Sequence, residues 1–321
     1  MKKIFVTRNW HVEAVKLLEK YFEVIVWNKT SIPTEDEIIE YSKDCFGLFT
    51  EFDDKITRKI VNSSTQLKII SNRAVGYENI DINSAKQNKI RIGNTPGVLV
   101  ETCADFTMGL MLDLARNITY SNRAVLKGDW KTFNQTPYLG TDVYNKKLAI
   151  IGLGQIATAF SRRAIHGFNM DVSYWSRNRK IKIENELGLK YVDNINDLIT
   201  SCDYLSIHCA LTPETYRIID KEQFELMKNV KLINTSRGPT INQNELLIAL
   251  NNGTVESAAL DVTDPEPPDY NSEIVNHPKV IITPHLGSGS KDTFNKMALM
   301  AAGNIINVNQ NKDMVSEVII D

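Results

Sequence analysis

The chain has 321 residues, enough for about two domains, and a net charge of −2, from 37 lysines and arginines against 39 aspartates and glutamates. A charge this close to zero provides neither a basic surface for nucleic acid nor an acidic tail. Hydrophobic residues make up 42% and charged residues 24%, which excludes a mainly disordered chain. No apolar run approaches the roughly 20 residues that span a bilayer. We therefore expect a globular protein without nucleic-acid or membrane partners.

The N-terminus favours a cytoplasmic location, and the cysteines indicate neither a metal nor a redox site. Two lysines after Met1 precede only three apolar residues, at positions 4–6, whereas the apolar core of a signal peptide has roughly 7–15. The four cysteines, at positions 45, 103, 202 and 209, lack the close spacing that is typical of zinc or redox pairs. We interpret them as small buried hydrophobic residues.

In the first part of the chain, short apolar runs alternate with helical patterns. Such an alternation predicts a parallel sheet with helices on both faces. The apolar runs are continuous, as is typical of strands that are covered on both sides. The predicted strands cover residues 3–7, 22–27, 47–50, 67–71 and 90–93, and helices between them include residues 13–21, 34–41 and 81–87.

The alternation of strand and helix patterns is interrupted at residues 94–97, where a Pro-Gly pair predicts a hinge. One long helix is expected at residues 101–127, followed by an arm or loop as far as residue 145. A second alternating block then predicts a second parallel sheet, so the fold class is α/β with two doubly wound domains. The last helix, at residues 293–308, could belong to either domain. Strands of the second block cover residues 148–152, 171–175, 204–209, 231–235, 258–262 and 280–283.

A glycine-rich turn at residues 152–157 follows an apolar run at 147–151 and precedes a helical pattern. Gly152 suits the tight turn, Gly154 lets the backbone approach a pyrophosphate, and Ala157 is small enough for close helix–strand packing. The N-terminus of the helix offers free amides and the positive end of its dipole to phosphates. This placement predicts a dinucleotide site, although a tight turn without a ligand would have the same glycines. The turn residues expected to contact the cofactor are Gly152, Leu153, Gly154, Gln155 and Ile156.

The end of the next predicted strand indicates which dinucleotide is preferred. A site for NAD usually has a carboxylate about 20 residues after the turn, where it binds the ribose 2′-hydroxyl. Here a hydroxyl and several cations stand in its place, and arginine can bind a 2′-phosphate with two hydrogen bonds. We therefore predict NADP, with NAD as the alternative cofactor and a solvated basic loop as the alternative reading. The residues concerned are Ser176, Arg177, Asn178 and Arg179.

Three polar side chains follow predicted strands of the second sheet. In open parallel sheets, ligands bind outside the carboxyl ends of the strands. Arg237 could hold a carboxylate with two parallel hydrogen bonds, or form a surface salt bridge instead. His285 suits proton transfer near neutral pH. Glu266 lies among prolines, and if it meets His285 it would favour the charged imidazole and fix its tautomer.

The other four histidines do not share this placement. His11 is interpreted as a surface residue near the start of a helix, and His208, within an apolar run, as a core residue. His166 is expected at a helix end and His277 in a turn before a proline. His285 is therefore the candidate acid–base residue.

Six segments of the sequence resemble those of one known family. They are Val75-Gly76-Tyr77-Glu78-Asn79-Ile80-Asp81, Asn94-Thr95-Pro96-Gly97, the turn at 152–157, Asn234-Thr235-Ser236-Arg237-Gly238, Ala258-Ala259-Leu260-Asp261-Val262 with Pro265-Glu266-Pro267, and Thr283-Pro284-His285-Leu286-Gly287-Ser288. Together they resemble the D-isomer-specific 2-hydroxyacid dehydrogenase family over essentially the whole chain. Within this family, the segments at 128–130, 175–179 and 260–267 look most like glyoxylate/hydroxypyruvate reductases.

The resemblance implies reduction of glyoxylate, hydroxypyruvate or a similar short 2-oxo acid with NADPH. His285 would protonate the carbonyl oxygen, Glu266 would keep His285 protonated, and Arg237 would bind the substrate carboxylate and polarise the carbonyl. The backbone amides of Val75 and Gly76 would bind the other carboxylate oxygen. Further cofactor contacts implied are Cys209, Ala210, Thr235, Ser236, Gly287 and Asp261, the last to the nicotinamide carboxamide.

The resemblance also implies a discontinuous organisation. A flavodoxin-like substrate domain would combine residues 1–98 and 287–321, and a Rossmann NAD(P)-binding domain would cover residues 99–286. The long helix and arm of the cofactor domain would form a two-fold homodimer, in which Trp130 could reach the neighbouring site.

Two alternatives remain for the function. One is a D-2-hydroxyacid dehydrogenase with a bulkier substrate, whose side chain Thr50, Glu51 and Phe52 could contact because they follow a predicted strand. The other is a dinucleotide-sensing protein like the corepressors of the same fold, which can retain the same three polar residues. Formate dehydrogenases are disfavoured, since they pair the histidine with glutamine where this chain has Glu266.

Overall fold

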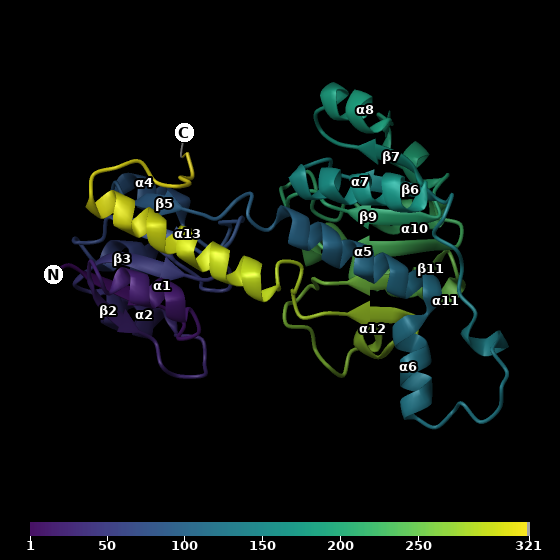
Figure 1. Cartoon of the computed structure of the whole chain (residues 1–321), viewed down its shortest axis with the longest axis horizontal. Helices are drawn as coiled ribbons and strands as arrows, with labels where there is room; N and C mark the ends of the chain where they lie inside the picture. The colour runs from purple at the N-terminus through teal and green to yellow at the C-terminus, as the bar shows by residue number, and fades with distance from the viewer. Residues whose placement is uncertain (320–321) are drawn as a thin grey trace. The chain divides into compact units, whose positions relative to one another are not determined.

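The structure is a computed structural model that describes residues 1–319, so residues 320 and 321 of the predicted substrate domain lie outside the described residues. The chain forms two compact units (Figure 1). Unit 1 joins Met1–Leu99 to Ser290–Asp321, and unit 2 is Val100–Gly289. Within residues 1–319, no helix combines the length and the apolar character needed to cross a membrane.

Unit 1 contains one parallel sheet whose helices lie on both faces. Its strands are β1 (Lys3–Val6), β2 (Glu23–Val26), β3 (Cys45–Thr50), β4 (Ile69–Asn72) and β5 (Arg91–Gly93), and its helices are α1 (Val12–Leu18), α2 (Glu35–Ser42), α3 (Arg58–Ser63), α4 (Ile82–Gln87) and α13 (Lys291–Asn309). The strand order β2-β1-β3-β4-β5 is that of flavodoxin-like sheets. Helices α1 and α13 pack on one face, and α2, α3 and α4 pack on the other. The last helix of the chain therefore belongs to unit 1.

Side-chain caps define where most helices of unit 1 begin. A side-chain oxygen accepts a hydrogen bond from the first helical turn at the starts of α2, α3, α4 and α13, and the capping residues are Thr34, Thr57, Asp81 and Ser290. Such caps satisfy backbone amides that have no partner within the helix. The short polar residues before each helical pattern thus fix the loops at the carboxyl ends of the strands.

Unit 2 contains a larger parallel sheet. Its strands are β6 (Lys147–Ile151), β7 (Asp171–Trp175), β8 (Lys190–Tyr191), β9 (Tyr204–Ile207), β10 (Val230–Asn234), β11 (Val255–Leu260) and β12 (Val280–Ile282). Its helices are α5 (Val100–Arg116), α6 (Ile118–Leu126), α7 (Gln155–Phe168), α8 (Ile181–Leu187), α9 (Ile195–Ile199), α10 (Lys221–Leu226), α11 (Gln243–Asn252) and α12 (Glu273–Asn276). The order β12-β11-β10-β9-β6-β7-β8 is the doubly wound order of dinucleotide-binding sheets. Helices α5 and α7 cover one face and α9 to α12 the other, so the predicted fold class is confirmed.

The single helix predicted at residues 101–127 is wrong, because the structure divides it into α5 and α6 at Asn117. Asn117 has φ = 53°, in the left-handed region that asparagine tolerates better than most residues. The carboxylate of Asp113 accepts hydrogen bonds from the backbone N–H and the hydroxyl of Thr119, which stabilises the new helix start. No residue of α6 is buried, and this helix projects from the rest of unit 2 (Figure 1).

Candidate active site

The turn between β6 and α7 has the geometry that a dinucleotide requires. Gly152 has φ = +91°, and a Cβ there would lie 2.6 Å from the backbone nitrogen of Cys209, so only glycine fits. Nothing lies within 4 Å of a Cβ built on Gly154, the N-cap of α7. The first amides of α7 have no acceptor within the helix, and they stand at the positive end of its dipole. Because space and donors coincide here, the residues fit the pyrophosphate of a dinucleotide.

The two predicted phosphate-binding arginines after β7 differ in their surroundings. Arg179 pairs with the carboxylate of Glu184, with 3.0 Å from Nε to Oε1 and 2.8 Å from Nη2 to Oε2. The hydrogen bonds from Arg179 and Tyr174 lower the pKa of Glu184. Arg177 is exposed and forms no hydrogen bond or ion pair within residues 1–319, although, after the hydrogen bond from Thr212, its charge also contributes to lowering the pKa of Glu214. Of the two guanidinium groups, that of Arg177 is therefore the more available for a phosphate.

The hydroxyl of Ser176, at the end of β7, donates a hydrogen bond to the carbonyl oxygen of Asn178, at 2.7 Å. This bond closes the turn from which Arg177 projects. Cys209 and Ala210 follow β9, while Thr235 and Ser236 follow β10. The structure thus places all these predicted cofactor contacts at the carboxyl edge of one sheet, the edge at which α7 begins.

The three predicted catalytic residues follow three neighbouring strands. Arg237 follows β10, Glu266 follows β11 and His285 follows β12, and these strands are paired in parallel. The distance from Nδ1 of His285 to Oε1 of Glu266 is 2.6 Å. Both side chains are partly exposed, so they are accessible to a small molecule. This pairing fixes one ring nitrogen of His285 on the carboxylate and leaves Nε2 on the opposite side of the ring.

Asn234, the last residue of β10, organises the loop that carries Arg237. Its Oδ1 accepts hydrogen bonds from the backbone N–H (3.0 Å) and hydroxyl (2.9 Å) of Ser236. Its Nδ2 donates to the carbonyl oxygen of Arg237 at 3.0 Å and to the hydroxyl of Thr240 at 3.2 Å. Asn234 is fully buried. It therefore determines the path of the backbone on both sides of Arg237.

Gly238 lets the loops after β10 and β11 pack closely together. A Cβ at this position would lie 1.9 Å from the carbonyl oxygen of Thr263. Any other residue would push apart the two loops that carry Arg237 and Glu266. The glycine of the predicted motif is therefore required by packing at the site.

Asp261 holds the turn that carries His285. Its Oδ1 accepts from the hydroxyl of Thr283 (2.6 Å) and the N–H of Leu286 (2.7 Å), and its Oδ2 accepts from the N–H of Gly287 (2.7 Å). Burial raises the pKa of Asp261, although these hydrogen bonds oppose that effect. His285 itself has φ = 53°, a conformation that such a network can maintain. The hydrogen bonds of Asp261 join it to Thr283, Leu286 and Gly287 within this turn. Direct contacts of Asp261 and Gly287 with the cofactor therefore stay predictions.

In unit 1, Val75 and Gly76 lie in the loop at residues 73–79, which follows β4. Within residues 1–319, their backbone N–H groups donate no hydrogen bond. The loop carbonyl groups, by contrast, are bonded: those of Ala74, Val75 and Gly76 accept from Thr95 N (2.8 Å), Asn94 Nδ2 (2.9 Å) and Asn72 Nδ2 (3.0 Å). Two adjacent amides without acceptors can bind an anion.

Some residues at these edges were not identified correctly from the sequence. The prediction that His11 lies at the surface is wrong, because it is buried and contacts Glu51. Asn234 and Arg73 were not singled out as structural centres, although each stands at the end of a buried strand. Arg237 and His285 were identified because they follow the ends of buried strands. The same criterion could have identified Asn234 and Arg73.

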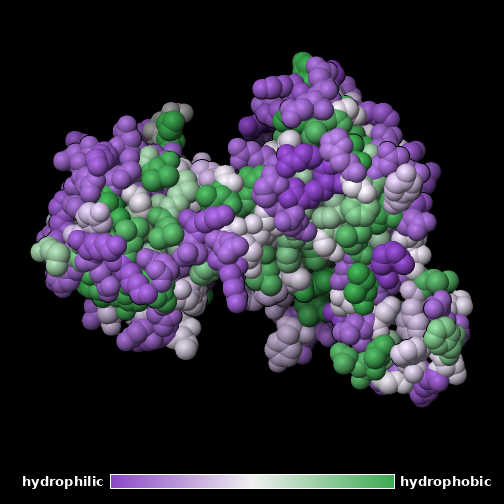
Figure 2. Space-filling view, viewed as in Figure 1, coloured by the Kyte–Doolittle hydropathy of each residue, from purple (hydrophilic) through white to green (hydrophobic). Residues whose placement is uncertain are grey.

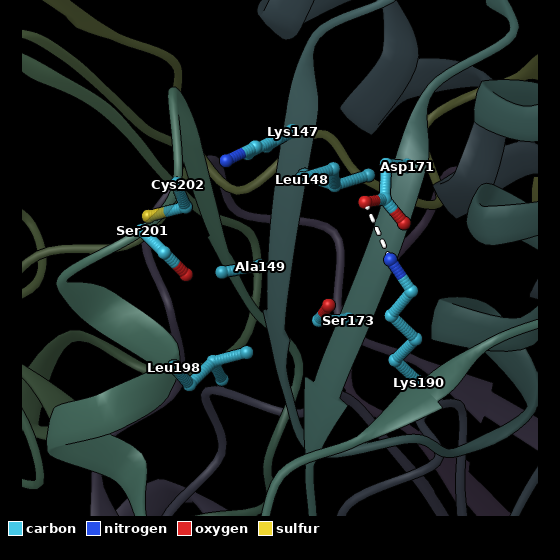
Figure 3. Close-up of a pocket in the computed structure, with 9 residues that line it drawn as sticks. All are labelled: Lys147, Leu148, Ala149, Asp171, Ser173, Lys190, Leu198, Ser201 and Cys202. Carbon is cyan, nitrogen blue, oxygen red and sulfur yellow. Dashed lines mark hydrogen bonds and ion pairs between the residues drawn. The ribbon is translucent and has the colours of Figure 1, made fainter.

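A hollow of about 210 Å³ lies at the opposite edge of the sheet in unit 2 (Figure 3). It is lined by the first residues of β6 and β7, Lys147 and Asp171, and by Cys202 ahead of β9. Lys190 closes one side through an ion pair of 2.8 Å with Asp171. The hollow is at the amino ends of the strands, away from Arg237, Glu266 and His285, and is therefore separate from the candidate site.

Comparison with known proteins agrees with this geometry. The family model for "D-isomer specific 2-hydroxyacid dehydrogenase, NAD binding domain" matches residues 108–287. The glyoxylate reductase of Thermococcus litoralis is 38% identical over 309 residues, which cover 95% of this chain and 92% of that protein. A crystal structure of a Thermus thermophilus protein is 31% identical, with a TM-score of 0.93 and coverage of 99% of this chain and 100% of that chain. An NADPH-dependent glyoxylate/hydroxypyruvate reductase from Sinorhizobium meliloti, in complex with NADP and malonate, is 25% identical, with a TM-score of 0.86 and coverage of 99% and 96%.

Proposed function

Because the chain belongs to the D-isomer-specific 2-hydroxyacid dehydrogenase family, we propose that it reduces glyoxylate or hydroxypyruvate to the D-2-hydroxy acid with NADPH. It is an NAD(P)-dependent D-2-hydroxyacid dehydrogenase of the glyoxylate reductase type. The observation that carries the proposal is the His285–Glu266 pair beside the loop of Arg237, since these groups provide a proton donor and an anion-binding cation on neighbouring strands.

Arg237 and the loop amides of unit 1 have complementary tasks in this reaction. A guanidinium can bind one oxygen of the substrate carboxylate and the adjacent carbonyl oxygen, which makes the carbonyl carbon more electrophilic. The N–H groups of Val75 and Gly76 would bind the other carboxylate oxygen. The turn after β6 would hold NADPH, which would supply the hydride to the carbonyl carbon.

His285 completes the reduction by supplying the proton. As negative charge develops on the carbonyl oxygen, Nε2–H of the imidazolium donates its proton to that oxygen and leaves a neutral imidazole. Glu266 favours the protonated ring before the reaction and holds its orientation through Nδ1. In the oxidative direction the same nitrogen would accept the proton from the hydroxyl of the D-2-hydroxy acid.

The preference for NADPH rests on the end of β7. Ser176 stands where NAD sites place a carboxylate, so nothing at this position would repel a 2′-phosphate. Arg177 is exposed and free of ion pairs within residues 1–319, and it can bind the phosphate with two hydrogen bonds. Arg179, held by Glu184, would support the loop rather than the phosphate.

The proposal is tested by following cofactor oxidation at 340 nm with purified protein. NADPH and NADH are each combined with glyoxylate, hydroxypyruvate and pyruvate, and the configuration of the product is determined. We expect the highest kcat/KM for NADPH with glyoxylate or hydroxypyruvate, and a D product from hydroxypyruvate. A strong preference for NADH would contradict the cofactor assignment alone. Cofactor binding without turnover of any 2-oxo acid would contradict the enzymatic proposal and favour a dinucleotide sensor.

A bulkier 2-oxo acid is the second candidate substrate, because one edge of unit 1 exposes large apolar side chains. Trp10 follows β1, Phe52 follows β3, and Val75 and Tyr77 follow β4, and all four are more than a third exposed. Exposed apolar side chains at the carboxyl ends of neighbouring strands suit an apolar substituent on the substrate. If kcat/KM for phenylpyruvate or 2-oxoisocaproate exceeded that for hydroxypyruvate, the family assignment would stand and the substrate assignment would change.

We also propose a homodimer formed through unit 2. The apolar residues exposed on α6 and the following loop include Ile118, Val125, Leu126, Trp130 and Phe133. Figure 2 shows apolar surface gathered on this projecting part of unit 2. A helix with no buried residue cannot stabilise itself by packing within the chain, so a second copy of the chain is the occupant that we propose for this surface.

A further inference from the structure

Behind the loop at residues 73–79 lies a buried charged network of three side chains from three loops. His11 precedes α1, Glu51 directly follows β3, and Arg73 directly follows β4. Glu51 is the centre: its Oε1 contacts Nε2 of His11, and both of its oxygens accept hydrogen bonds from Arg73. The distances are 2.7 Å from Nε of Arg73 to Oε1 and 2.5 Å from Nη2 to Oε2.

Glu51 holds both ends of this loop. Its side chain binds Arg73 at the start, and its backbone carbonyl oxygen accepts a hydrogen bond of 3.0 Å from Nδ2 of Asn79 at the end. The same Nδ2 donates to the carbonyl oxygen of Asp54 at 2.8 Å. The backbone N–H of Glu51 is in turn fixed by the carboxylate of Asp54, at 2.8 Å. Between the two held ends lie Val75 and Gly76.

Aromatic rings exclude water from the network. The imidazole of His11 lies between the rings of Phe49 and Phe294, with centroid distances of 5.1 Å to each. Phe294, from the first turn of α13, also faces the guanidinium of Arg73 at 4.1 Å. The side chains of His11, Glu51 and Arg73 are each less than a tenth exposed. Direct contact of Glu51 with a substrate is therefore not its role.

A buried network of this kind fixes geometry more effectively than it stabilises the fold. Burial alone would raise the pKa of Glu51, but the hydrogen bonds from His11 and Arg73 outweigh it and lower the pKa. Glu51 therefore stays ionised with both oxygens bound. Apolar side chains of similar size would often be as stable in the interior, but they would not specify directions between three loops.

We infer that Glu51 is a positioning residue for substrate binding, which acts with His11 and Arg73 to set the conformation of the loop at residues 73–79. The loop conformation decides where the N–H groups of Val75 and Gly76 point, and so how well they bind a carboxylate. The inference rests on the proposed function, in which these amides bind the carboxylate of the 2-oxo acid.

The test replaces the whole network at once, in the variant His11→Phe/Glu51→Leu/Arg73→Met, so that no buried charge is left without a partner. We expect this variant to fold, to bind NADPH as the wild type does, and to show faster hydrogen exchange in residues 73–79. We expect KM for the 2-oxo acid and the inhibition constant of oxamate, an unreactive carboxylate, to rise about tenfold or more. The value of kcat should fall less than KM rises, because the amides bind the carboxylate in ground and transition states alike.

The conservative variant Glu51→Gln provides a second measurement in case the triple variant does not fold. It keeps the shape of the side chain and one acceptor oxygen, so a smaller change in the same direction is expected. The matched control is Lys231→Met/Glu256→Leu, which removes an ion pair with one nearly buried partner from the amino edge of the other sheet. This control should change neither KM nor the exchange of residues 73–79.

The outcomes distinguish the inference from the proposed function. If the triple variant folds with wild-type loop exchange, wild-type KM and wild-type oxamate binding, Glu51 does not position the loop and the inference is wrong. If the wild type neither reduces a 2-oxo acid nor binds oxamate, the proposed function fails. Hydrogen exchange would then still report whether the network holds the loop, because it requires no substrate.

Discussion

Nδ1 of His285 lies 2.6 Å from Oε1 of Glu266, although 19 positions separate the two residues in the chain. The pairing arises because β11 and β12 are parallel neighbours, which places both strand ends at one edge. The ring of His285, the proposed proton donor, is therefore oriented by a residue from the adjacent loop. Substitution of Glu266 is the most direct test of the acid–base assignment.

The variant Glu266→Gln keeps the size of the side chain and removes its charge. Proton donation requires the His285 ring to be held in one orientation beside a carboxylate that offsets its positive charge, and the amide supplies no such charge. We expect kcat/KM for the 2-oxo acid to fall about tenfold or more, with cofactor affinity retained. Steady-state rates at a fixed pH check this, with Glu273→Gln as an exposed control. An unchanged kcat/KM would remove Glu266 from the mechanism.

Asn234→Asp tests whether the Arg237 loop depends on one buried amide. The substitution keeps the acceptor for Ser236 but loses the two donated bonds to Arg237 and Thr240. We expect the free energy of unfolding to fall by roughly 3–5 kcal/mol, because two donated bonds are lost and a buried carboxylate then faces the carbonyl oxygen of Arg237. Because Arg237 then loses its fixed position, kcat/KM should fall about tenfold or more, with cofactor affinity retained. Chemical denaturation and steady-state kinetics, with Asn244→Asp as control, measure both effects; full activity despite the lost stability would show that the loop does not need Asn234.

Arg177→Ala and Arg179→Ala distinguish the two predicted phosphate ligands. Loss of a charged hydrogen bond to the 2′-phosphate should raise KM for NADPH about tenfold or more and leave KM for NADH nearly unchanged. We expect this selective effect for Arg177 only, because Arg179 is paired with Glu184. For Arg179→Ala, smaller and similar changes with both cofactors are expected. Steady-state kinetics with each cofactor provide the comparison, and a larger selective loss for Arg179→Ala would reverse the assignment.

Leu126→Glu tests the proposed dimer. Leu126 is 78% exposed within the chain, and a carboxylate there should disrupt an apolar interface and give a monomer. Sedimentation velocity at micromolar concentration measures the change, with Lys127→Glu at the adjacent position as control. A wild-type protein that sediments as a monomer at all concentrations would exclude the dimer itself.

The parallel sheets could be predicted because their strands are continuous apolar runs, and the order of strands follows from the family resemblance. The three polar residues after β10, β11 and β12 could be identified by position, since parallel strands bring their carboxyl ends together. Periodicity also led to the error at Asn117. The apolar pattern continues across this residue, and only a left-handed backbone conformation, stabilised by Asp113, ends the first helix.

Other features could not be predicted because they depend on which charged side chains meet. The sequence shows Arg177 and Arg179 as equivalent cations, but the fold brings Glu184 against only one of them. His11 stands near a predicted helix start, which indicated exposure. It is buried because Phe294, nearly the whole length of the chain away, packs on its ring. Contacts between residues so far apart in the chain leave no local pattern in the sequence.

The division of unit 1 between two distant segments affects the order of events during synthesis. Unit 2, Val100–Gly289, is continuous and can fold as soon as it has left the ribosome. The sheet of unit 1 lacks α13 until residue 309 has emerged, so the apolar surface that α13 covers, including one side of the His11 ring, stays exposed meanwhile. At ordinary rates of translation this interval lasts about 10–40 s. The sheet of unit 1 therefore stays incomplete until α13 docks, after the folding of unit 2 can begin.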